Sequence, residues 1–224
     1  MNLIEYPDRE MMMIDLANRL AGEINSTVLR TGAATLAVPG GTTPGPVFDA
    51  LCAADLDWDK VTVMPTDERC VPDGSDRSNA RLIRGRLLCD RAAAARFVPL
   101  YADAATPEAA LDAALPAVRD ALPLTVLLLG MGADMHTASL FPGADGLDAA
   151  LASRAPPLAV VRPADQPEAR VTLTAPVLRD AMSIHILITG ADKRAALDRA
   201  RQTGDPQRAP ILTALPEATI HWAE

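Results

Sequence analysis

A continuous apolar run, Val-Leu-Leu-Leu at residues 126–129, is followed at once by two closely spaced glycines, Gly130 and Gly132. An unbroken run of Val and Leu is typical of a parallel β-strand that is buried on both faces of a sheet. Glycine directly after such a strand lets the backbone turn sharply and approach a ligand closely. Because ligands of open α/β sheets bind beyond the carboxyl ends of the strands, we expect the functional site to form around this loop.

Short apolar segments alternate along the chain with segments of helical periodicity. Strands are expected at residues 35–38, 61–64, 97–100, 124–129, 183–189 and 219–222, and a half-exposed strand at 170–174. Helices are expected at residues 9–29, 44–51, 80–89 and 106–121, at Pro176, after Gly190 and near Ile211, the first burying Ile14, Leu20, Ile24 and Val28. The pattern predicts an α/β protein with one domain over residues 1–224, with or without a small additional lobe. Residues 143–167 form either a lid or a long connection.

The charge balance limits the partners that the protein can have. With 29 acidic and 21 basic residues, the formal net charge is -8 at pH 7, which argues against nucleic acid and against an anionic membrane surface. Positive charges for an anionic ligand must therefore be gathered locally. No run reaches the length of a membrane span, and Glu5 and Asp8 lie where a secretory signal would be basic, so we expect a cytoplasmic protein.

The three cysteines, Cys52, Cys70 and Cys89, are odd in number and lack the spacing of a zinc site. This favours free thiols in a reducing compartment over disulfides, and we expect no metal. His185 alternates with apolar residues, and we expect His185 and His221 to be structural strand residues.

Asp134 and His136 lie two residues apart in the loop after residues 126–129. A carboxylate at this spacing can orient an imidazole or raise its basicity, which makes His136 a candidate water-activating base. The structural alternative is that loops between strands and helices often contain Gly, Asp and His without a function. Thr137 and Ser139 resemble the start of a helix whose free amides face an anion.

A candidate phosphate cradle follows residues 35–38. It combines two permissive glycines, two hydroxyl groups and a proline suited to the first turn of a helix, in the order Gly40, Gly41, Thr42, Thr43 and Pro44. Backbone amides and the helix dipole would both point at an anion there. The loop has neither the Gly-Lys-Ser/Thr ending of a Walker loop nor the dinucleotide pattern, so an ordinary turn stays open as an alternative.

Charged residues follow two more of the expected strands. Asp67 and Arg69 come after residues 61–64. Charged residues at this edge of the sheet either contribute to the functional site or are ordinary solvated loop residues. Asn79 follows at the start of the next helix, where Ser78 or Asn79 is the expected N-cap. Lys193 begins a helix and is one of only two lysines, and its compact ammonium suits a phosphate oxygen as well as it suits solvent.

Taken in order, these motifs resemble the 6-phosphogluconolactonase family, within the superfamily that includes glucosamine-6-phosphate isomerases. The resemblance rests on Gly-Gly-Thr-Thr-Pro at 40–44, Asp-Glu-Arg at 67–69, Ser-Asn at 78–79, Gly-Met-Gly-x-Asp-x-His-Thr-Ala-Ser-Leu-Phe-Pro at 130–142, Arg-Val-Thr-Leu-Thr at 170–174 and Gly-x-x-Lys at 190–193. It covers nearly the whole chain, and the segment from His136 to Pro142 is highly specific. It implies a Rossmann-like, doubly wound and mainly parallel sheet with helices on both faces, in agreement with the pattern above.

The resemblance implies hydrolysis of 6-phospho-D-glucono-1,5-lactone to 6-phosphogluconate in the oxidative pentose phosphate pathway, without metal or organic cofactor. A δ-lactone is an activated ester, so a positioned base and oxyanion stabilisation suffice for its hydrolysis. By resemblance, His136 is the base, Asp134 orients it, and Arg69 stabilises substrate or developing negative charge. The expected partner is this small sugar-phosphate lactone, and the expected assembly is a monomer or homodimer.

The resemblance also assigns the substrate-binding residues. The 6-phosphate lies on the loop of Gly40, Gly41, Thr42 and Thr43, with Arg170 and Lys193 as cationic partners, and Asp67 and Asn79 complete the substrate site.

Met135 departs from the family, whose loop usually reads Asp-Gly-His where this chain has Asp134-Met135-His136. We expect an ordinary negative φ at Met135 with activity retained, because every other motif residue is present. If φ is positive instead, a side chain at this position is strained, and the strain can displace His136. Met135→Gly would then raise kcat. A sugar-phosphate isomerase or deaminase and a non-catalytic sugar-phosphate-binding protein stay as alternatives, and Met135 is the residue that favours the latter.

Overall fold

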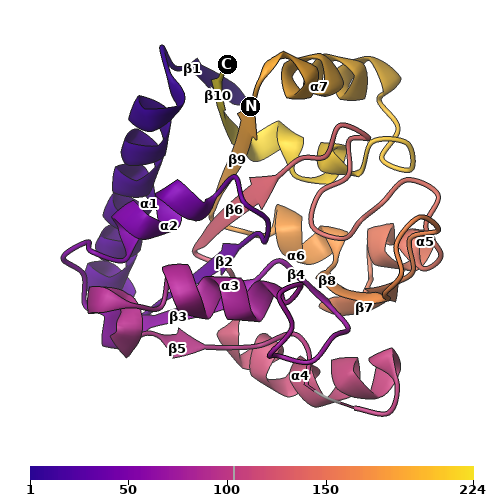
Figure 1. Cartoon of the computed structure of the whole chain (residues 1–224), viewed down its shortest axis with the longest axis horizontal. Coiled ribbons are helices and arrows are strands. Elements are labelled where there is room, and N and C mark those ends of the chain that lie inside the picture. Colours follow the sequence, from indigo (N-terminus) through magenta and orange to yellow (C-terminus); the bar gives the residue numbers. More distant parts are fainter. Residues whose placement is uncertain (103) are drawn as a thin grey trace.

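The computed structural model describes residues 1–102 and 104–224 (Figure 1). Its main sheet contains β1 (Asn2–Glu5), β2 (Ala34–Val38), β3 (Val61–Pro65), β5 (Arg96–Phe97), β6 (Val126–Gly130), β9 (Ser183–Thr189) and β10 (Thr219–Ala223). The strand order is β1-β10-β9-β6-β2-β3-β5, and every neighbouring pair is parallel. The sequence therefore predicted the parallel α/β sheet correctly, although β1 was not expected and β5 is shorter than residues 97–100.

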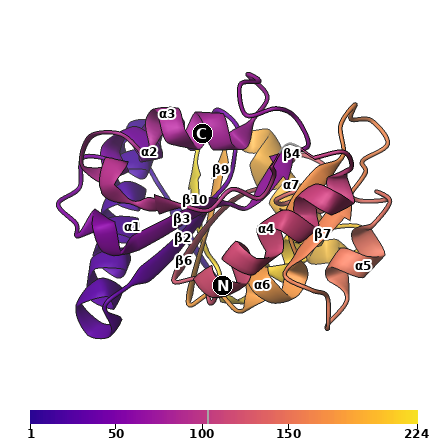
Figure 2. The ribbon, with the colours of Figure 1, turned by 90° about the horizontal axis from the view of Figure 1, so that it is seen from below.

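Helices cover both faces of this sheet (Figure 2). One face carries α1 (Arg9–Thr31), α2 (Gly45–Leu51) and α3 (Asn79–Arg86), and the other carries α4 (Pro107–Ala121), α5 (Leu147–Leu151), α6 (Ala175–Arg179) and α7 (Ala191–Thr203). Leu36 and Val38 of β2 belong to the buried cluster that includes α1 and α2, whereas Ala37 between them belongs to the cluster on the opposite face. This alternation follows from the two-residue period of a strand, and it confirms the doubly wound prediction.

The order of the central strands opens a crevice at one edge of the sheet. The chain passes from β2 to β3 on one side of β2 and later returns to β6 on its other side. Loops that follow β2 and β6 therefore diverge toward opposite faces, which is the switch point where ligands bind in open α/β sheets. The loops after β3 and β9 lie next to them, so four adjacent carboxyl ends supply the site.

A second sheet holds three antiparallel strands, β4 (Asp67–Arg69), β8 (Arg170–Leu173) and β7 (Leu158–Val161), in that order. The strand expected at 170–174 is present as β8, but the expectation that it is half-exposed was wrong, since all four residues of β8 are buried. Polar side chains of β8 find partners inside the protein. The hydroxyl of Thr172, for example, accepts a hydrogen bond from the amide of Ser139 at 3.2 Å. Residues 143–167 are also more regular than expected, since they include α5 and β7.

Other local expectations also need correction. No helix begins at Thr137 in the described structure; the amide of Leu140 instead donates to the carbonyl of Thr137 at 2.9 Å in a tight turn. The hydroxyl of Thr137 donates to the carbonyl of Gly130 rather than capping a helix. Ile14, expected to face inward, is 50% exposed, and the segment near Ile211 is a short 3-10 helix. Among the described residues, no helix is long and apolar enough to span a membrane.

Candidate active site

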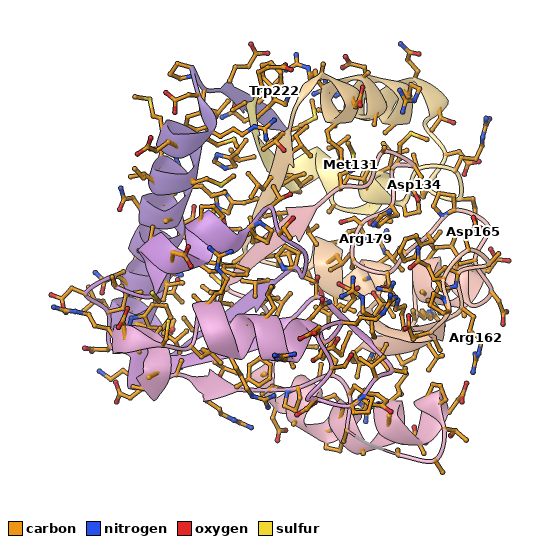
Figure 3. All side chains as sticks on the ribbon, in the orientation of Figure 1. Met131, Asp134, Arg162, Asp165, Arg179 and Trp222 are labelled. Carbon is orange, nitrogen blue, oxygen red and sulfur yellow. The ribbon has the colours of Figure 1, made fainter. Side chains whose placement is uncertain are left out.

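A cleft of about 330 Å³ lies where β2, β3, β6 and β9 end, a size that suits a small molecule. Its lining includes nine of the residues proposed from the sequence, namely Gly40, Gly41, Thr43, Asp67, Arg69, Asn79, His136, Arg170 and Lys193. Thr42 does not line the cleft and is exposed beside Thr43. Asp134 does not line the cleft; it is an exposed residue beside His136 in the loop between β6 and α5, which Figure 3 shows with Met131 and Asp134 labelled.

The loop after β6 places an imidazole and a carboxylate side by side. Nδ1 of His136 is 2.6 Å from Oδ1 of Asp134. An ionised carboxylate only accepts hydrogen bonds, so in the neutral imidazole the hydrogen belongs on Nδ1, which leaves Nε2 as the nitrogen that can accept a proton. Partial burial acts to raise the pKa of Asp134, but the hydrogen bond and charge of His136 outweigh it and hold that pKa below its usual value. The pair therefore has the chemistry of an oriented general base.

Two neighbours fix the position of this pair. A Cβ on Gly132 would overlap Nδ1 of His136 and Oδ1 of Asp134, so the close approach requires glycine at this position. Phe141 stacks on the imidazole, with the ring centroids 4.1 Å apart and the planes inclined by 29°. The ring of Phe141 was part of the recognised motif, but sequence reasoning gave it no role.

Met135 has a φ of +69°, so the expectation of a negative φ was wrong. The amide of Met135 donates to the carbonyl of Gly132 at 3.0 Å, and the amide of Gly132 donates to the carbonyl of His136 at 2.9 Å. Such a pair of bonds closes a two-residue turn that is followed by a left-handed residue, a position usually taken by glycine. His136 nevertheless lines the same cleft as Gly40 and Gly41, so it is not turned away from the phosphate loop.

Asp67 links the loop after β6 to the second sheet. Its Oδ2 accepts a hydrogen bond from the hydroxyl of Ser139 at 2.5 Å and lies 3.9 Å from Nη1 of Arg170, while Oδ1 accepts from Thr66 at 3.1 Å. Sequence reasoning missed this role of Ser139, which only the motif at 136–142 could have suggested.

Gln166 was also missed, because it lies in a segment without a sequence pattern. Its Oε1 accepts from Nη2 of Arg170 at 3.0 Å, and its side chain helps to line the cleft.

Glu68 holds the start of α3 against β4, a role that sequence reasoning did not identify. Its buried carboxylate accepts hydrogen bonds from the amides of Arg69, Asn79 and Ala80 and from the hydroxyl of Ser78. Burial raises the pKa of Glu68 despite these bonds. Asn79 is thereby fixed, with its Nδ2 donating to the carbonyl of Asp67 at 2.8 Å and its Oδ1 3.4 Å from Nη1 of Arg69.

Two arginine side chains of the cleft carry unused hydrogen-bond donors. Nε of Arg69 and Nε of Arg170 are buried and have no hydrogen-bond partner among the described residues. Arg170 is only 5% exposed, and burial lowers the pKa of its guanidinium. Leaving a buried donor unpaired costs roughly 1–3 kcal/mol, so these two groups point to a ligand that supplies oxygen acceptors.

The cysteines are free, as expected, but two of them meet in space. Cys52 and Cys89 converge with Asp90 in the only group of three or more potential metal ligands found among the described residues. None of the three lines the cleft. Sequence spacing did not reveal this cluster, because its members come from segments 37 residues apart.

The parallel sheet, the switch-point cleft and the Asp–His pair are those of an α/β enzyme. Residues 7–222 match the family described as glucosamine-6-phosphate isomerases/6-phosphogluconolactonase, and the chain belongs to this family. A 6-phosphogluconolactonase of Mesorhizobium japonicum is 44% identical over 97% of this chain and 93% of its own length. Another, from Rhizobium meliloti, is 43% identical over 100% and 98%. The crystal structure of a 6-phosphogluconolactonase from Shewanella baltica matches with a TM-score of 0.94 at 30% identity, covering 100% of this chain and 97% of that one.

Proposed function

We propose that the protein is a carboxylic ester hydrolase that converts 6-phospho-D-glucono-1,5-lactone to 6-phosphogluconate in the oxidative pentose phosphate pathway. The observation that carries the proposal is the 2.6 Å contact of Asp134 with His136, which lines the same cleft as the two arginines with unpaired donors. The Asp134–His136 pair suits the activation of water. The arginine donors suit an anionic ligand that is rich in oxygen atoms. Relatives that bear the name of this activity match nearly the whole chain.

In the proposed mechanism, Nε2 of His136 takes a proton from a water molecule as the water oxygen bonds to the lactone carbonyl carbon. Asp134 stabilises the imidazolium that forms, since its carboxylate accepts the hydrogen of Nδ1. Arg69 stabilises the negative charge on the carbonyl oxygen of the tetrahedral intermediate. The bond between the carbonyl carbon and the ring oxygen then breaks, and the imidazolium returns its proton to that oxygen. No nucleophilic side chain is needed, because the substrate is already an activated ester.

The phosphate of the substrate is proposed to lie on the loop after β2. Gly41 has a φ of +86°, which turns the backbone there, and α2 begins directly after the loop. Lys193 approaches the cleft from the first turn of α7, and Arg170 approaches it from β8. Backbone amides and two cations from different elements together form a site suited to a phosphate dianion.

Hydrolysis of the phosphorylated lactone, followed through the release of 6-phosphogluconate in a coupled assay, tests this function. The lactone also hydrolyses without an enzyme, so the rate is measured against His136→Ala protein at the same concentration. Unphosphorylated glucono-1,5-lactone serves as the substrate control, and we expect a much lower kcat/KM for it because the phosphate site stays empty. Release of ammonia from glucosamine 6-phosphate without lactone turnover would assign the protein to the deaminase alternative.

A non-catalytic sugar-phosphate-binding protein is the second candidate, and the positive φ of Met135 is the observation that favours it. Against it, His136 lines the cleft and keeps its bond to Asp134. Calorimetric binding of 6-phosphogluconate combined with no lactone turnover above the spontaneous rate would decide for this candidate.

A further inference from the structure

Cys52, Cys89 and Asp90 bring three potential ligand atoms together on the face of the sheet that α2 and α3 cover (Figure 1). Cys52 directly follows α2, and Cys89 and Asp90 begin the 3-10 segment after α3. Their two sulfur atoms and one carboxylate oxygen all lie within 4.8 Å of one another, and Sγ of Cys52 is 3.7 Å from Oδ2 of Asp90.

These separations are close to those in a tetrahedral zinc site. With a Zn–S bond of about 2.3 Å and a Zn–O bond of about 2.0 Å, tetrahedral angles place two sulfurs about 3.8 Å apart and a sulfur and an oxygen about 3.5 Å apart. The separation of 3.7 Å between Cys52 and Asp90 already fits. Since no pair exceeds 4.8 Å, side-chain adjustments of about 1 Å or less would bring all three atoms onto one cation.

The chemistry of the cluster also favours a cation. Two thiols select thiophilic metals, and a carboxylate adds a fixed negative charge. The arginines nearby in sequence have other partners, because Arg86 pairs with Asp49 and Arg91 pairs with Asp55. Among the described residues, Asp90 has no ion-pair partner.

The accessibility of the three residues suits entry of an ion. Asp90 is exposed and Cys89 is half-buried, whereas Cys52 is only 3% exposed. Metal binding requires thiolates, so a bound cation replaces the protons of the two thiols.

We propose that Cys52, Cys89 and Asp90 form a site for a thiophilic divalent cation of the zinc class, with water as the fourth ligand. Binding replaces the protons of both thiols, which leave to solvent, and involves no change of oxidation state. The site joins the end of α2 to the segment that follows α3. Because α2 has seven residues, it separates the site from the phosphate loop by about 10 Å, so the cation has a structural rather than a catalytic place.

Cobalt(II) titration of the reduced, metal-free full-length protein tests the proposal, because thiolate coordination gives a charge-transfer absorption band in the near ultraviolet. We expect the band to saturate at one equivalent and to disappear on addition of zinc. Cys52→Ser and Cys89→Ser should each lower zinc affinity by on the order of 100-fold, and Asp90→Asn by roughly 10-fold or more, measured by competition with a chelating indicator. Cys70→Ser is the matched control and should bind like the wild type, since Cys70 lies outside the cluster.

Circular dichroism first establishes that each variant is folded. Asp90→Asn changes an exposed side chain, so it keeps the test valid even if substitution of the buried Cys52 unfolds the protein. A band of unchanged intensity and affinity in folded Asp90→Asn and Cys89→Ser proteins would overturn the proposal. So would the absence of a thiolate band in the wild type, or equal loss of affinity in Cys70→Ser.

Discussion

Met135→Gly removes a side chain from a residue whose φ is +69°. This left-handed conformation costs a residue with a Cβ atom roughly 1–2 kcal/mol, and glycine avoids that cost. The substitution also removes a half-buried side chain that packs against the core cluster of the α4 and α7 face. Full burial of a methionine contributes about 1.5–3 kcal/mol, so the half-buried packing lost here is worth about 1 kcal/mol.

The two effects oppose each other, so we expect the unfolding free energy of Met135→Gly to lie within about 1 kcal/mol of the wild type. Met135→Ala is the matched control, because it loses the same packing but keeps a Cβ at positive φ. The glycine variant should therefore be more stable than the alanine variant by about 1 kcal/mol. At a residue of ordinary negative φ in a regular element, the order would be reversed by about 0.5–1 kcal/mol, so the sign itself reports the backbone conformation.

The strain at Met135 is expected to leave catalysis largely unaffected. Asp134, the stacked ring of Phe141 and the bond from the amide of Gly132 to the carbonyl of His136 all hold His136 in place. Moving the imidazole by 1 Å would disrupt these contacts, each worth about 1 kcal/mol, for a comparable release of strain. We therefore expect kcat of Met135→Gly to stay within about threefold of the wild type, whereas a base misplaced by about 1 Å loses on the order of 100-fold.

Urea unfolding of the wild type and both variants gives the free energies, and the coupled lactonase assay gives kcat and KM. A gain in kcat of about tenfold or more in Met135→Gly, absent from Met135→Ala, would show that strain displaces the base and would refute this reasoning. A glycine variant less stable than the alanine variant would contradict the left-handed conformation itself.

Further expectations follow from the same structure. His136→Ala should lower kcat by about 100-fold or more while 6-phosphogluconate binding changes little, and near-wild-type kcat would rule out this base. Lys193→Ala and Arg170→Ala should mainly raise KM, and a drop in kcat at unchanged KM would contradict their proposed place at the phosphate. Lactonase activity should survive EDTA, because the potential metal ligands that converge among the described residues lie outside the cleft. Loss of activity in EDTA that a divalent cation restores, seen also in folded Cys89→Ser protein whose cluster lacks one thiol, would reject the metal-independent mechanism. Burial, with the nearby His185, lowers the pKa of His221 to about 4, so between about pH 6.5 and 4 the unfolded chain binds a proton that the folded protein does not. The free energy of unfolding, measured with urea, should thus fall by up to about 3 kcal/mol as the pH drops through that range. The fall should be smaller in His221→Gln protein.

The strands of the sheet could be predicted because local composition decides them. The expected runs at residues 35–38, 61–64 and 183–189 correspond closely to β2, β3 and β9, whose side chains are mostly buried. β1 was missed, since it is a short edge strand with exposed ends whose parallel pairing with β10 joins opposite ends of the chain. Pairings of this kind depend on tertiary contacts, which no local window of sequence contains.

The types of residue in the cleft could be read from the loops, but their partners could not. Ser139 bonds to Asp67 across 72 positions of the chain, and the sequence suggested only a helix start for that hydroxyl. Hydroxyl residues serve equally well as caps and as tertiary donors, so the outcome depends on which carboxylate the fold brings near. At Met135 the presence of every other motif residue misled the prediction of a negative φ, because the backbone hydrogen bonds of Gly132 decide the local conformation.

The two carboxylates of the site, Asp134 and Asp67, have different hydrogen-bond partners, and this difference supports different roles for them. Asp134 accepts from His136, whereas both oxygens of Asp67 accept from hydroxyl groups and one lies 3.9 Å from the guanidinium of Arg170. Phe141 contacts a partner of each carboxylate, since its ring centroid lies 4.1 Å from that of the His136 imidazole and 5.8 Å from Cζ of Arg170. We infer that the aromatic ring of Phe141 lines the cleft next to both His136, the proposed base, and Arg170, the proposed partner of the anion, so that one side chain helps to position both.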